Sequence, residues 1–279
     1  MSFRTYKPEL NATAVIPFHN GLDHLYRTLA GLANQSYPRD LIDAIVVTDG
    51  EIPQPPKFIR KLLRLRTITM PFRGYRPATS RNIGIQHATG DVILSLDFDM
   101  ICHPQTIEEH LKIFHQNPRV ATIGHRKFVD ANILTPWDVL KEPETLQRLP
   151  KVRSISNTSG GYYDKRLPEF TFFRKHKYPF NCFHGCNVAY FRDDAIDAGN
   201  WNTAFDGVYG YEDLEFGLRL WENNVELVYN ELAYAYHQEN RVVSRHKKAR
   251  DRQFNLEKLY GAIPKLRDYR RKLAMLVGR

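Results

Sequence analysis

The sequence predicts an α/β protein whose mostly parallel sheet is flanked by helices. Short apolar runs typical of buried strands alternate with segments of helical periodicity over residues 12–118. Polar side chains, mostly aspartates, directly follow several of these runs. The chain has 279 residues, 42% of them hydrophobic and 25% charged, which is enough for a sizeable core. Ligands bind beyond the carboxyl ends of strands in such sheets, so we expect a functional crevice where these polar groups gather.

The first half of the chain repeats a strand followed by a helix. Apolar runs that end in proline or aspartate predict the strands, and apolar residues at helical spacing predict the helices. This alternation implies right-handed crossovers between parallel neighbours. In order, we expect a strand at 12–18, a helix at 21–38, a strand at 43–50, a helix at 55–65, a strand at 66–72, a helix at 77–90, a strand at 91–100 and a helix at 103–118.

The second half of the chain is less regular. Residues 130–180 are rich in proline and basic residues, and we expect an insertion or lid over the crevice with a flexible point at residues 159–161. The later pattern predicts a strand at 186–192, a helix at 209–224 and two short strands at 225–230 and 233–238. We therefore expect one domain over residues 1–240.

The net charge of +9 is concentrated at the C-terminus, where residues 241–279 contain 13 Lys or Arg against 3 Asp or Glu. The rest of the chain is nearly neutral, which disfavours a nucleic-acid-binding core. We expect residues 241–279 to form a basic helical extension interrupted at Pro264. This extension either packs back on the domain or contacts anionic lipid headgroups through its basic side chains.

The cysteines and the N-terminus indicate the compartment. Cys102, Cys182 and Cys186 are an odd and sparse set, which fits buried thiols in a reducing compartment better than a disulfide framework. No apolar stretch reaches the length needed to span a bilayer, and "MSFRTYKPEL" lacks the apolar core of a signal peptide. We therefore expect a cytoplasmic protein, with any membrane contact peripheral and at the inner face.

The segment "VILSLDFDM" at 92–100 leads from a buried strand into two aspartates. In an extended segment Asp97 and Asp99 point the same way, and two carboxylates held this close raise each other's pKa unless a cation lies between them. A polar strand end followed by an ordinary turn explains the same residues. Similarly, Glu212 and Asp213 at the start of a helix can simply stabilise its positive end. Both pairs therefore allow a functional and a structural interpretation.

The ordered set of motifs resembles the GT-A-fold glycosyltransferases, most closely those of family 2. The resemblance covers most of residues 12–240, and it implies a GT-A fold with a Rossmann-like sheet. It further implies transfer of a sugar from a nucleoside-diphosphate sugar, UDP-linked in the usual pattern, to a hydroxyl group of a glycan, lipid-linked or peptide acceptor. The residues that carry it are "VIPFHN" at 15–20, "VVTDG" at 46–50, "ATSRNIGIQHATGDVILSLDFDM" at 78–100, "HGCNVAYFR" at 184–192, "YGYEDLEFGLRL" at 209–220, and His237.

The resemblance also assigns roles in donor binding. It implies a divalent cation, Mn²⁺ or Mg²⁺, that binds Asp99 directly, with Asp97 assisting and His237 as a further ligand. Such a cation stabilises the charge that grows on a diphosphate leaving group. The full set of expected donor-binding residues is Pro17, His19, Asp49, Arg81, Asp97, Phe98, Asp99 and Gly185.

Within this set, the resemblance makes Asp49 the partner of a uracil ring and Arg81 the group beside the diphosphate. The sequence departs from the usual pattern at Thr48, where a first aspartate is common, and at Glu51, where serine is common. The identity of the base therefore stays open. Arg73 and Arg76 lie nearby in sequence and are alternatives to Arg81 as phosphate ligands.

For catalysis, the resemblance implies that Asp213 is the general base and that Glu212 binds the acceptor, or the reverse. A base opposite the diphosphate implies inversion at the anomeric carbon. "FHN" and "EDLEFGLRLW" also resemble the retaining polypeptide N-acetylgalactosaminyltransferases, which carry Asp-x-His where this chain has Asp97-Phe98-Asp99. That difference favours inversion. A non-catalytic protein that binds sugar nucleotides or carbohydrates is the remaining alternative.

Overall fold

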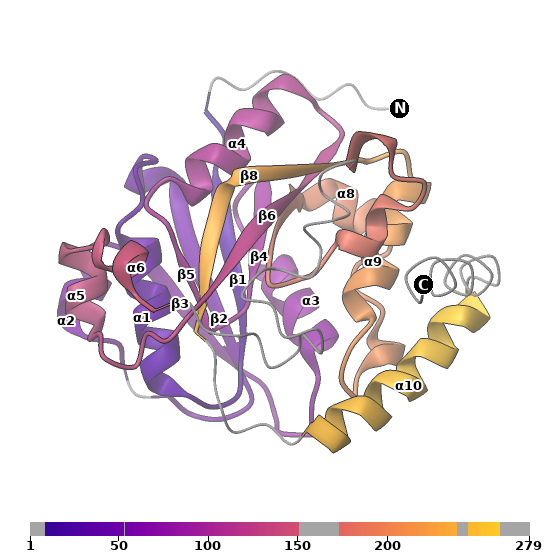
Figure 1. Cartoon of the computed structure of the whole chain (residues 1–279), viewed down its shortest axis with the longest axis horizontal. Coiled ribbons are helices and arrows are strands. Elements are labelled where there is room, and N and C mark those ends of the chain that lie inside the picture. The colour runs from indigo at the N-terminus through magenta and orange to yellow at the C-terminus, as the bar shows by residue number, and fades with distance from the viewer. Residues whose placement is uncertain (1–8, 53, 151–172, 239–244, 263–279) are drawn as a thin grey trace.

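The computed structural model describes residues 9–52, 54–150, 173–238 and 245–262, and its centre is an eight-stranded sheet with helices on both faces (Figure 1). The strands are β1 Ala12–Phe18, β2 Ile42–Thr48, β3 Arg64–Thr69, β4 Val92–Leu96, β5 Met100–Cys102, β6 Val120–Val129, β7 Asn187–Phe191 and β8 Glu226–Gln238. The helices are α1 Leu22–Ala33, α2 Lys57–Arg60, α3 Pro77–His87, α4 Thr106–Gln116, α5 Pro136–Lys141, α6 Thr145–Arg148, α8 Arg192–Asp197, α9 Glu212–Glu222 and α10 Arg245–Ala262.

The strand order is β3-β2-β1-β4-β7-β6-β8-β5. Strands β3, β2, β1 and β4 are mutually parallel, as the alternation of strands and helices predicts. Strand β7 then pairs antiparallel with both β4 and β6, and β8 runs parallel to β6. Because β5 pairs antiparallel with the end of β8, the segment that follows β4 lies beside the last residues of β8.

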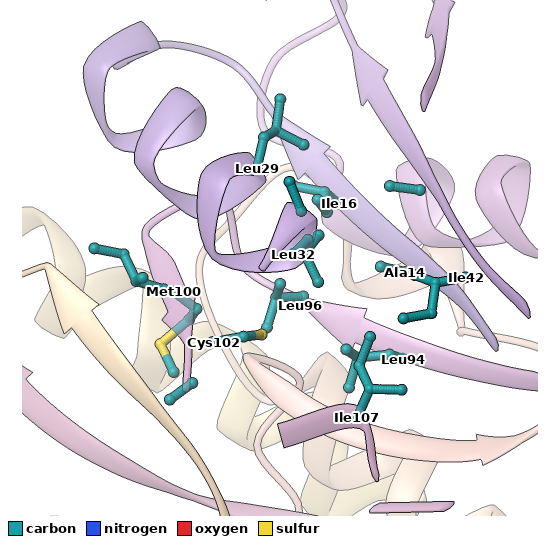
Figure 2. Close-up of a cluster of buried hydrophobic side chains, with 14 of the residues drawn as sticks. Ala14, Ile16, Leu29, Leu32, Ile42, Leu94, Leu96, Met100, Cys102 and Ile107 are labelled. Carbon is teal, nitrogen blue, oxygen red and sulfur yellow. The ribbon is translucent and has the colours of Figure 1, made fainter. Parts of the chain in front are cut away.

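Two hydrophobic clusters cover the two faces of this sheet. Figure 2 shows part of the first, where Leu29 and Leu32 of α1 lie over Ile16 of β1 and Leu96 of β4. The second cluster packs α3, α8 and α9 on the opposite face around the fully buried Trp201. Strands β1, β2 and β4 are buried almost throughout, which explains why their sequences read as continuous apolar runs.

The predicted elements of the first half are largely confirmed, with one clear error. The expected helix at 55–65 is only the four-residue α2, and β3 begins at Arg64, inside the segment that was expected to be helical. The apolar spacing of this segment suits a helix, but Leu63 is buried in the first hydrophobic cluster at the point where the chain enters an edge strand.

The second half contains more order than the sequence predicts. Strand β6 and helix α8 were not expected, and the short helices α5 and α6 lie within the segment at 130–180 that was expected to be irregular. The two short strands expected at 225–230 and 233–238 form the single strand β8, although its register with β6 shifts between Gly124 and Arg126. The flexible point expected at 159–161 lies outside the described residues.

Helix α10 confirms the helical extension and packs against the domain. Leu259 is fully buried in the second cluster, with Leu256 and Tyr260 partly buried beside it. This contact agrees with the interpretation that the extension packs back on the domain. Pro264 and the rest of the extension lie outside the described residues. Within the described part of the chain, no helix has the length and apolar character needed to cross a membrane.

Candidate active site

The two aspartates of the "DFD" segment lie in a tight turn between β4 and β5. The Met100 amide donates to the Asp97 carbonyl at 3.1 Å and closes this turn. The Phe98 carbonyl accepts from Thr28 Oγ1 of α1 at 2.7 Å, and the Asp99 carbonyl accepts from a backbone amide of β8 at 2.8 Å. The expected extended geometry is therefore wrong at these residues. A turn held by two other elements positions the carboxylates instead.

The side chains of the two aspartates have different neighbours. Asp97 Oδ1 accepts from Arg81 Nη2 at 3.0 Å, whereas Asp99 Oδ2 lies 3.7 Å from His237 Nε2. The Asp99 and His237 side chains are each 20% exposed, so solvent reaches both. Strand pairing places His237 opposite Met100, immediately after the turn. The structure thus brings together the predicted pair of Asp99 and His237, whereas the Asp97 side chain binds Arg81.

A divalent cation fits this pair by the chemistry of its donors. Carboxylate oxygen and imidazole nitrogen are both suitable ligands for a cation such as Mn²⁺. Atoms 3.7 Å apart can both reach one ion through bonds of about 2.1 Å. Among the described residues, no cluster of three or more His, Cys, Asp or Glu is arranged to hold an ion. The described protein therefore offers two ligands, and a bound diphosphate or water would have to supply the others.

Arg81 lies behind the turn and connects it to helix α9. The Arg81 side chain is 4% exposed and donates from Nε to Ser95 Oγ at 3.1 Å, from Nη1 to Glu212 Oε1 at 3.4 Å and from Nη2 to Asp97 Oδ1 at 3.0 Å. Its guanidinium carbon lies 4.4 Å from the centre of the Trp201 ring. Burial opposes the charge of Arg81, but the carboxylates of Asp97 and Glu212 outweigh this effect and raise its pKa. Each nitrogen of the predicted diphosphate ligand therefore already binds a protein group.

Gly185 packs against this arginine and contacts Asp213. A Cβ atom at Gly185 would lie 2.9 Å from Trp201 Cη2 and 3.0 Å from Arg81 Nη2, so a larger residue would displace one of them. The Gly185 carbonyl accepts from Ser95 Oγ at 2.9 Å, and its amide donates to Asp213 Oδ2 at 3.4 Å. The predicted Gly185 is thus a close packing point between β4 and the Glu-Asp pair.

Glu212 and Asp213 begin helix α9, directly after Tyr211 in the left-handed region at φ 73°. Glu212 is 6% exposed, and its Oε2 atom has no hydrogen-bond partner among the described residues. Burial, and then the charge of Asp213, raise the pKa of Glu212 to about 7, while Arg81 opposes the shift. Asp213 is half-buried, and its Oδ1 accepts from the Leu214 amide at 2.9 Å. Burial raises the pKa of Asp213 as well, again opposed by Arg81.

The predicted base-binding residues lie at the ends of β1 and β2. His19 Nδ1 lies 2.9 Å from both carboxylate oxygens of Asp49. The His19 ring stacks on Phe72 with ring centres 5.6 Å apart, and Phe72 is 63% exposed. Pro17 is paired within β1, opposite Val47. Together these residues form an exposed aromatic surface beside the Asp49 carboxylate, whose side chain is 9% exposed.

Phe98, in the turn, lies beside Phe18, the residue that precedes His19. Its ring contacts Phe18 edge to face, with ring centres 5.5 Å apart, and also lies 6.4 Å from the His24 ring. The predicted residues therefore fall into three adjoining groups: Pro17, His19 and Asp49 at the ends of β1 and β2; Phe98, Asp99 and His237 around the turn; and Arg81, Asp97, Gly185, Glu212 and Asp213 behind it.

Sequence reasoning missed three residues of these groups. Ser95 is the single polar residue within the buried strand β4. A lone hydroxyl group among apolar residues was the available signal for a polar contact there. Phe72 is the last residue of the third predicted strand, beside Pro71, a position that suits an exposed crevice edge. Trp201 gave no signal, because its contact with Arg81 joins residues 120 positions apart in the chain.

Comparison with known proteins identifies the family of the chain. Residues 13–198 match the model of Glycosyl transferase family 2. The chain is 30% identical to chondroitin synthase of Escherichia coli over 236 residues, which covers 81% of this chain but 34% of that protein. The chain therefore spans about a third of the length of that relative.

Solved structures agree on the fold. S. aureus TarS (residues 1–349) in complex with UDP-GlcNAc superposes with a TM-score of 0.58 at 18% identity, covering 84% of this chain and 60% of that one. The mannosyltransferase PcManGT from Pyrobaculum calidifontis, in complex with GDP-Man and Mn²⁺, superposes with a TM-score of 0.55 at 18% identity, covering 86% and 59%. The predicted GT-A fold is confirmed, and the chain belongs to glycosyltransferase family 2.

Proposed function

We propose that this glycosyltransferase uses a UDP-sugar and a divalent cation, and that it transfers the sugar with inversion to a hydroxyl group of a growing glycan or glycoconjugate. One observation carries the proposal. The buried guanidinium of Arg81 binds Asp97, from the metal-type turn, and Glu212, from the Glu-Asp pair, although the latter lies 131 residues further along the chain. Two motifs with separate chemistry therefore meet in one site.

The nucleoside end of the donor fits the surface formed by Asp49, His19 and Phe72. A carboxylate accepts the ring N–H of uracil, and an exposed aromatic ring offers a face for stacking. TarS binds UDP and UDP-GlcNAc, whereas PcManGT binds GDP-Man, so solved relatives of this fold use different bases. We favour uracil because Asp49 lies next to the exposed His19 and Phe72 rings.

Asp99 and His237 would hold the cation, with Asp97 one step behind because it binds Arg81. A bound cation of this kind stabilises negative charge on the departing diphosphate. The turn contributes rigidity, since its backbone is hydrogen-bonded to both α1 and β8. A rigid site spends less free energy on reorganisation during the reaction.

In this proposal Asp213 is the general base. It is half-buried, and backbone amides of Gly185 and Leu214 orient its carboxylate. The acceptor oxygen forms a bond to the anomeric carbon as its proton passes to Asp213, and the bond to the diphosphate oxygen breaks with its electron pair leaving on the diphosphate. Attack opposite the leaving group inverts the anomeric carbon. Glu212 is deeper and binds Arg81, so we assign it to positioning rather than to the proton transfer.

A panel of UDP-, GDP- and other nucleotide sugars tests the proposal. We expect release of the nucleoside diphosphate from one UDP-sugar when Mn²⁺ or Mg²⁺ is present, and no release after chelation. Proton NMR of the transferred sugar reports its anomeric configuration. A retained configuration would favour the polypeptide-type alternative. Tight binding of a nucleotide sugar without any turnover, across a panel of glycan, lipid-linked and peptide acceptors, would favour the non-catalytic alternative.

We also propose that the basic residues of 241–279 attach the enzyme peripherally to anionic lipid at the inner membrane face. Leu259 already packs into the core, so this contact would depend on charge rather than on insertion of an apolar face. Sedimentation with vesicles that contain phosphatidylserine should decrease strongly in about 0.5 M salt, because exposed charges are then screened. Binding that is insensitive to salt would contradict this mode of attachment.

A further inference from the structure

Resting on the proposed function, we infer that the acceptor presents a neutral sugar ring at the transfer site and that this ring stacks on Tyr75. The inference starts from an aromatic side chain that is open to solvent. Tyr75 is 44% exposed, and its ring lies 6.0 Å from the Tyr209 ring, with 45° between the two ring planes. Tyr75 is not among the site residues predicted from the sequence, and the donor and the general base do not require it.

The two tyrosines lie where the starts of α3 and α9 meet. Tyr75 is two residues before α3, and Tyr209 is three residues before Glu212, the first residue of α9. Arg81 of α3 donates to Glu212 Oε1 at 3.4 Å and so joins the same two helices. The Tyr75 ring therefore lies on the side of the site that holds the Glu-Asp pair, where the acceptor hydroxyl group has to bind.

The charges near Tyr75 agree with this location. Burial, and then the negative charge of Glu212, raise the pKa of Tyr75, although much of the residue is exposed. Asp97 adds to the shift and Arg81 opposes it. The guanidinium of Arg81 already binds both of these carboxylates. Because carboxylates lie near the ring and the nearby cation is compensated, the surroundings disfavour an anionic acceptor such as a lipid phosphate.

Hydrogen bonds fix the backbone on both sides of the ring pair. The Tyr75 carbonyl accepts from the Gly207 amide at 2.7 Å, which binds the loop before α3 to the loop before α9. In the second loop, the side-chain amide of the buried Asn255 donates to the carbonyl oxygens of Val208 and Gly210, the two neighbours of the second tyrosine. Little conformational entropy is lost when a ligand binds to a surface that is already ordered.

The chemistry of a sugar ring suits this surface. A face of a pyranose ring carries C–H groups that pack on an aromatic face, and its edge carries hydroxyl groups that donate to carboxylates. Within the described part of the chain, Glu212 Oε2 has no hydrogen-bond donor, and Asp213 is the proposed base. A sugar stacked on Tyr75 would therefore bring its hydroxyl groups to the two carboxylates at the start of α9.

The test measures steady-state kinetics with methyl glycosides of common hexoses and N-acetylhexosamines as acceptors. We expect Tyr75→Ala to raise the acceptor KM about 10-fold, while kcat and the KM of the UDP-sugar change by less than about 2-fold. Tyr75→Phe keeps the aromatic face, so its acceptor KM should stay within about 3-fold of the wild-type value.

The matched control is Trp137→Ala, which removes a ring of similar exposure, 49%, and should change neither KM. Trp137 belongs to α5, which packs in the first hydrophobic cluster, on the face of the sheet opposite α3 and α9. Figure 1 shows α5 at the edge of the molecule, away from both of those helices.

An unchanged acceptor KM in Tyr75→Ala, or a weakened affinity for the UDP-sugar in its place, would overturn the role of Tyr75 while leaving the proposed function intact. Transfer to a polyprenyl phosphate or to a serine-containing peptide, but to none of the glycosides, would overturn the sugar-ring acceptor in the same way. Failure of the wild-type protein to bind any nucleotide sugar in the panel would instead overturn the proposed function, and this inference with it.

A measurement on the wild-type chain covers the case in which Tyr75→Ala does not fold. With UDP and Mn²⁺ present, saturation-transfer NMR should show the strongest transfer to the hydrogens on one face of the methyl glycoside ring, because that face packs on the tyrosine. Equal transfer to the hydrogens of both faces would contradict stacking on Tyr75.

Discussion

Glu212 and Asp213 are consecutive residues with different surroundings. Glu212 is almost completely buried and binds Arg81, whereas Asp213 is half-buried and held by backbone amides. Burial raises the pKa of both carboxyl groups, and that of Glu212 reaches about 7. Neighbouring carboxyl groups whose environments differ in this way commonly take different roles in one reaction. The different surroundings of the two carboxyl groups therefore fit the proposal that Asp213 is the base and that Glu212 has another task.

The raised pKa of Glu212 predicts a pH-dependent stability in the absence of metal. Between its ordinary value near 4.5 and about 7, the folded protein retains a proton that the unfolded chain has lost. The free energy of unfolding should therefore fall as the pH rises through this range, with a contribution of up to about 1.4 kcal/mol per pH unit. Urea unfolding at several pH values measures this slope.

The variant Glu212→Gln should lose this part of the slope, because it has no proton to release. The matched control is Glu222→Gln, which changes an exposed carboxylate at the other end of the same helix and should keep the wild-type slope. A Glu212→Gln protein with the full wild-type slope would show that another group causes it.

The sequence could predict the residue types of the site but not all of their contacts. Asp97 and Asp99 follow a recognisable strand, so their position at its end was predictable. The turn that separates their side chains depends on hydrogen bonds from α1 and β8, which local sequence does not specify. Likewise, a charged residue in a helix such as Arg81 is usually exposed, and its burial requires carboxylates that lie far away in sequence.

At the scale of elements, helix α10 supports the loop that precedes Glu212 and Asp213. Asn255 is fully buried, and its Nδ2 donates to the carbonyl oxygens of Phe205 at 3.2 Å, Val208 at 3.1 Å and Gly210 at 2.8 Å. The same loop stabilises the start of α3, since Asp206 accepts from the amide of Ala78 at 3.0 Å. The basic extension therefore holds the backbone that leads into α9.

We expect Asn255→Ala to destabilise the protein by about 1–3 kcal/mol, because one buried and two partly buried carbonyl groups lose their donor. Turnover should also fall at temperatures where the variant remains folded, since the loop leads directly to Glu212. Thermal unfolding and steady-state kinetics measure the two effects. Gln253→Ala, an exposed position on the same helix, is the control and should alter neither. Wild-type stability in Asn255→Ala would refute the supporting role of α10.

The elements were predictable where one signal dominated. Buried parallel strands such as β1 and β2 read as apolar runs, and α1 and α4 show clear helical spacing. Strand β6 was missed because three polar and at least partly exposed residues, His125, Arg126 and Lys127, interrupt its apolar pattern. Strand β8 contains exposed residues such as Leu232 at its shift in register, so its sequence divides into two apparent strands.

At the scale of the whole molecule, the strand order explains how one site forms from distant segments. Parallel β1, β2 and β4 end at the same edge, as the sequence predicts. The antiparallel strand β7 follows Gly185, and the far end of β8 carries His237 back to the turn after β4. No local sequence pattern predicts which of these strands pair, because the pairing between β4 and β7 joins residues about a hundred positions apart. Bringing the motifs together therefore depends on long-range strand pairing as well as on the local sequence.

The central claim is that the aspartate turn and the Glu-Asp pair form one active site with separate tasks. Measurement of donor affinity and turnover in two variants, Asp99→Ala and Asp213→Asn, tests this claim most directly. Asp99→Ala should abolish the Mn²⁺-dependent part of UDP-sugar binding. Asp213→Asn should bind the donor with nearly unchanged affinity and transfer sugar about 10²- to 10⁴-fold more slowly. Wild-type turnover in Asp213→Asn, or Mn²⁺-dependent binding that is unchanged in Asp99→Ala, would contradict the account.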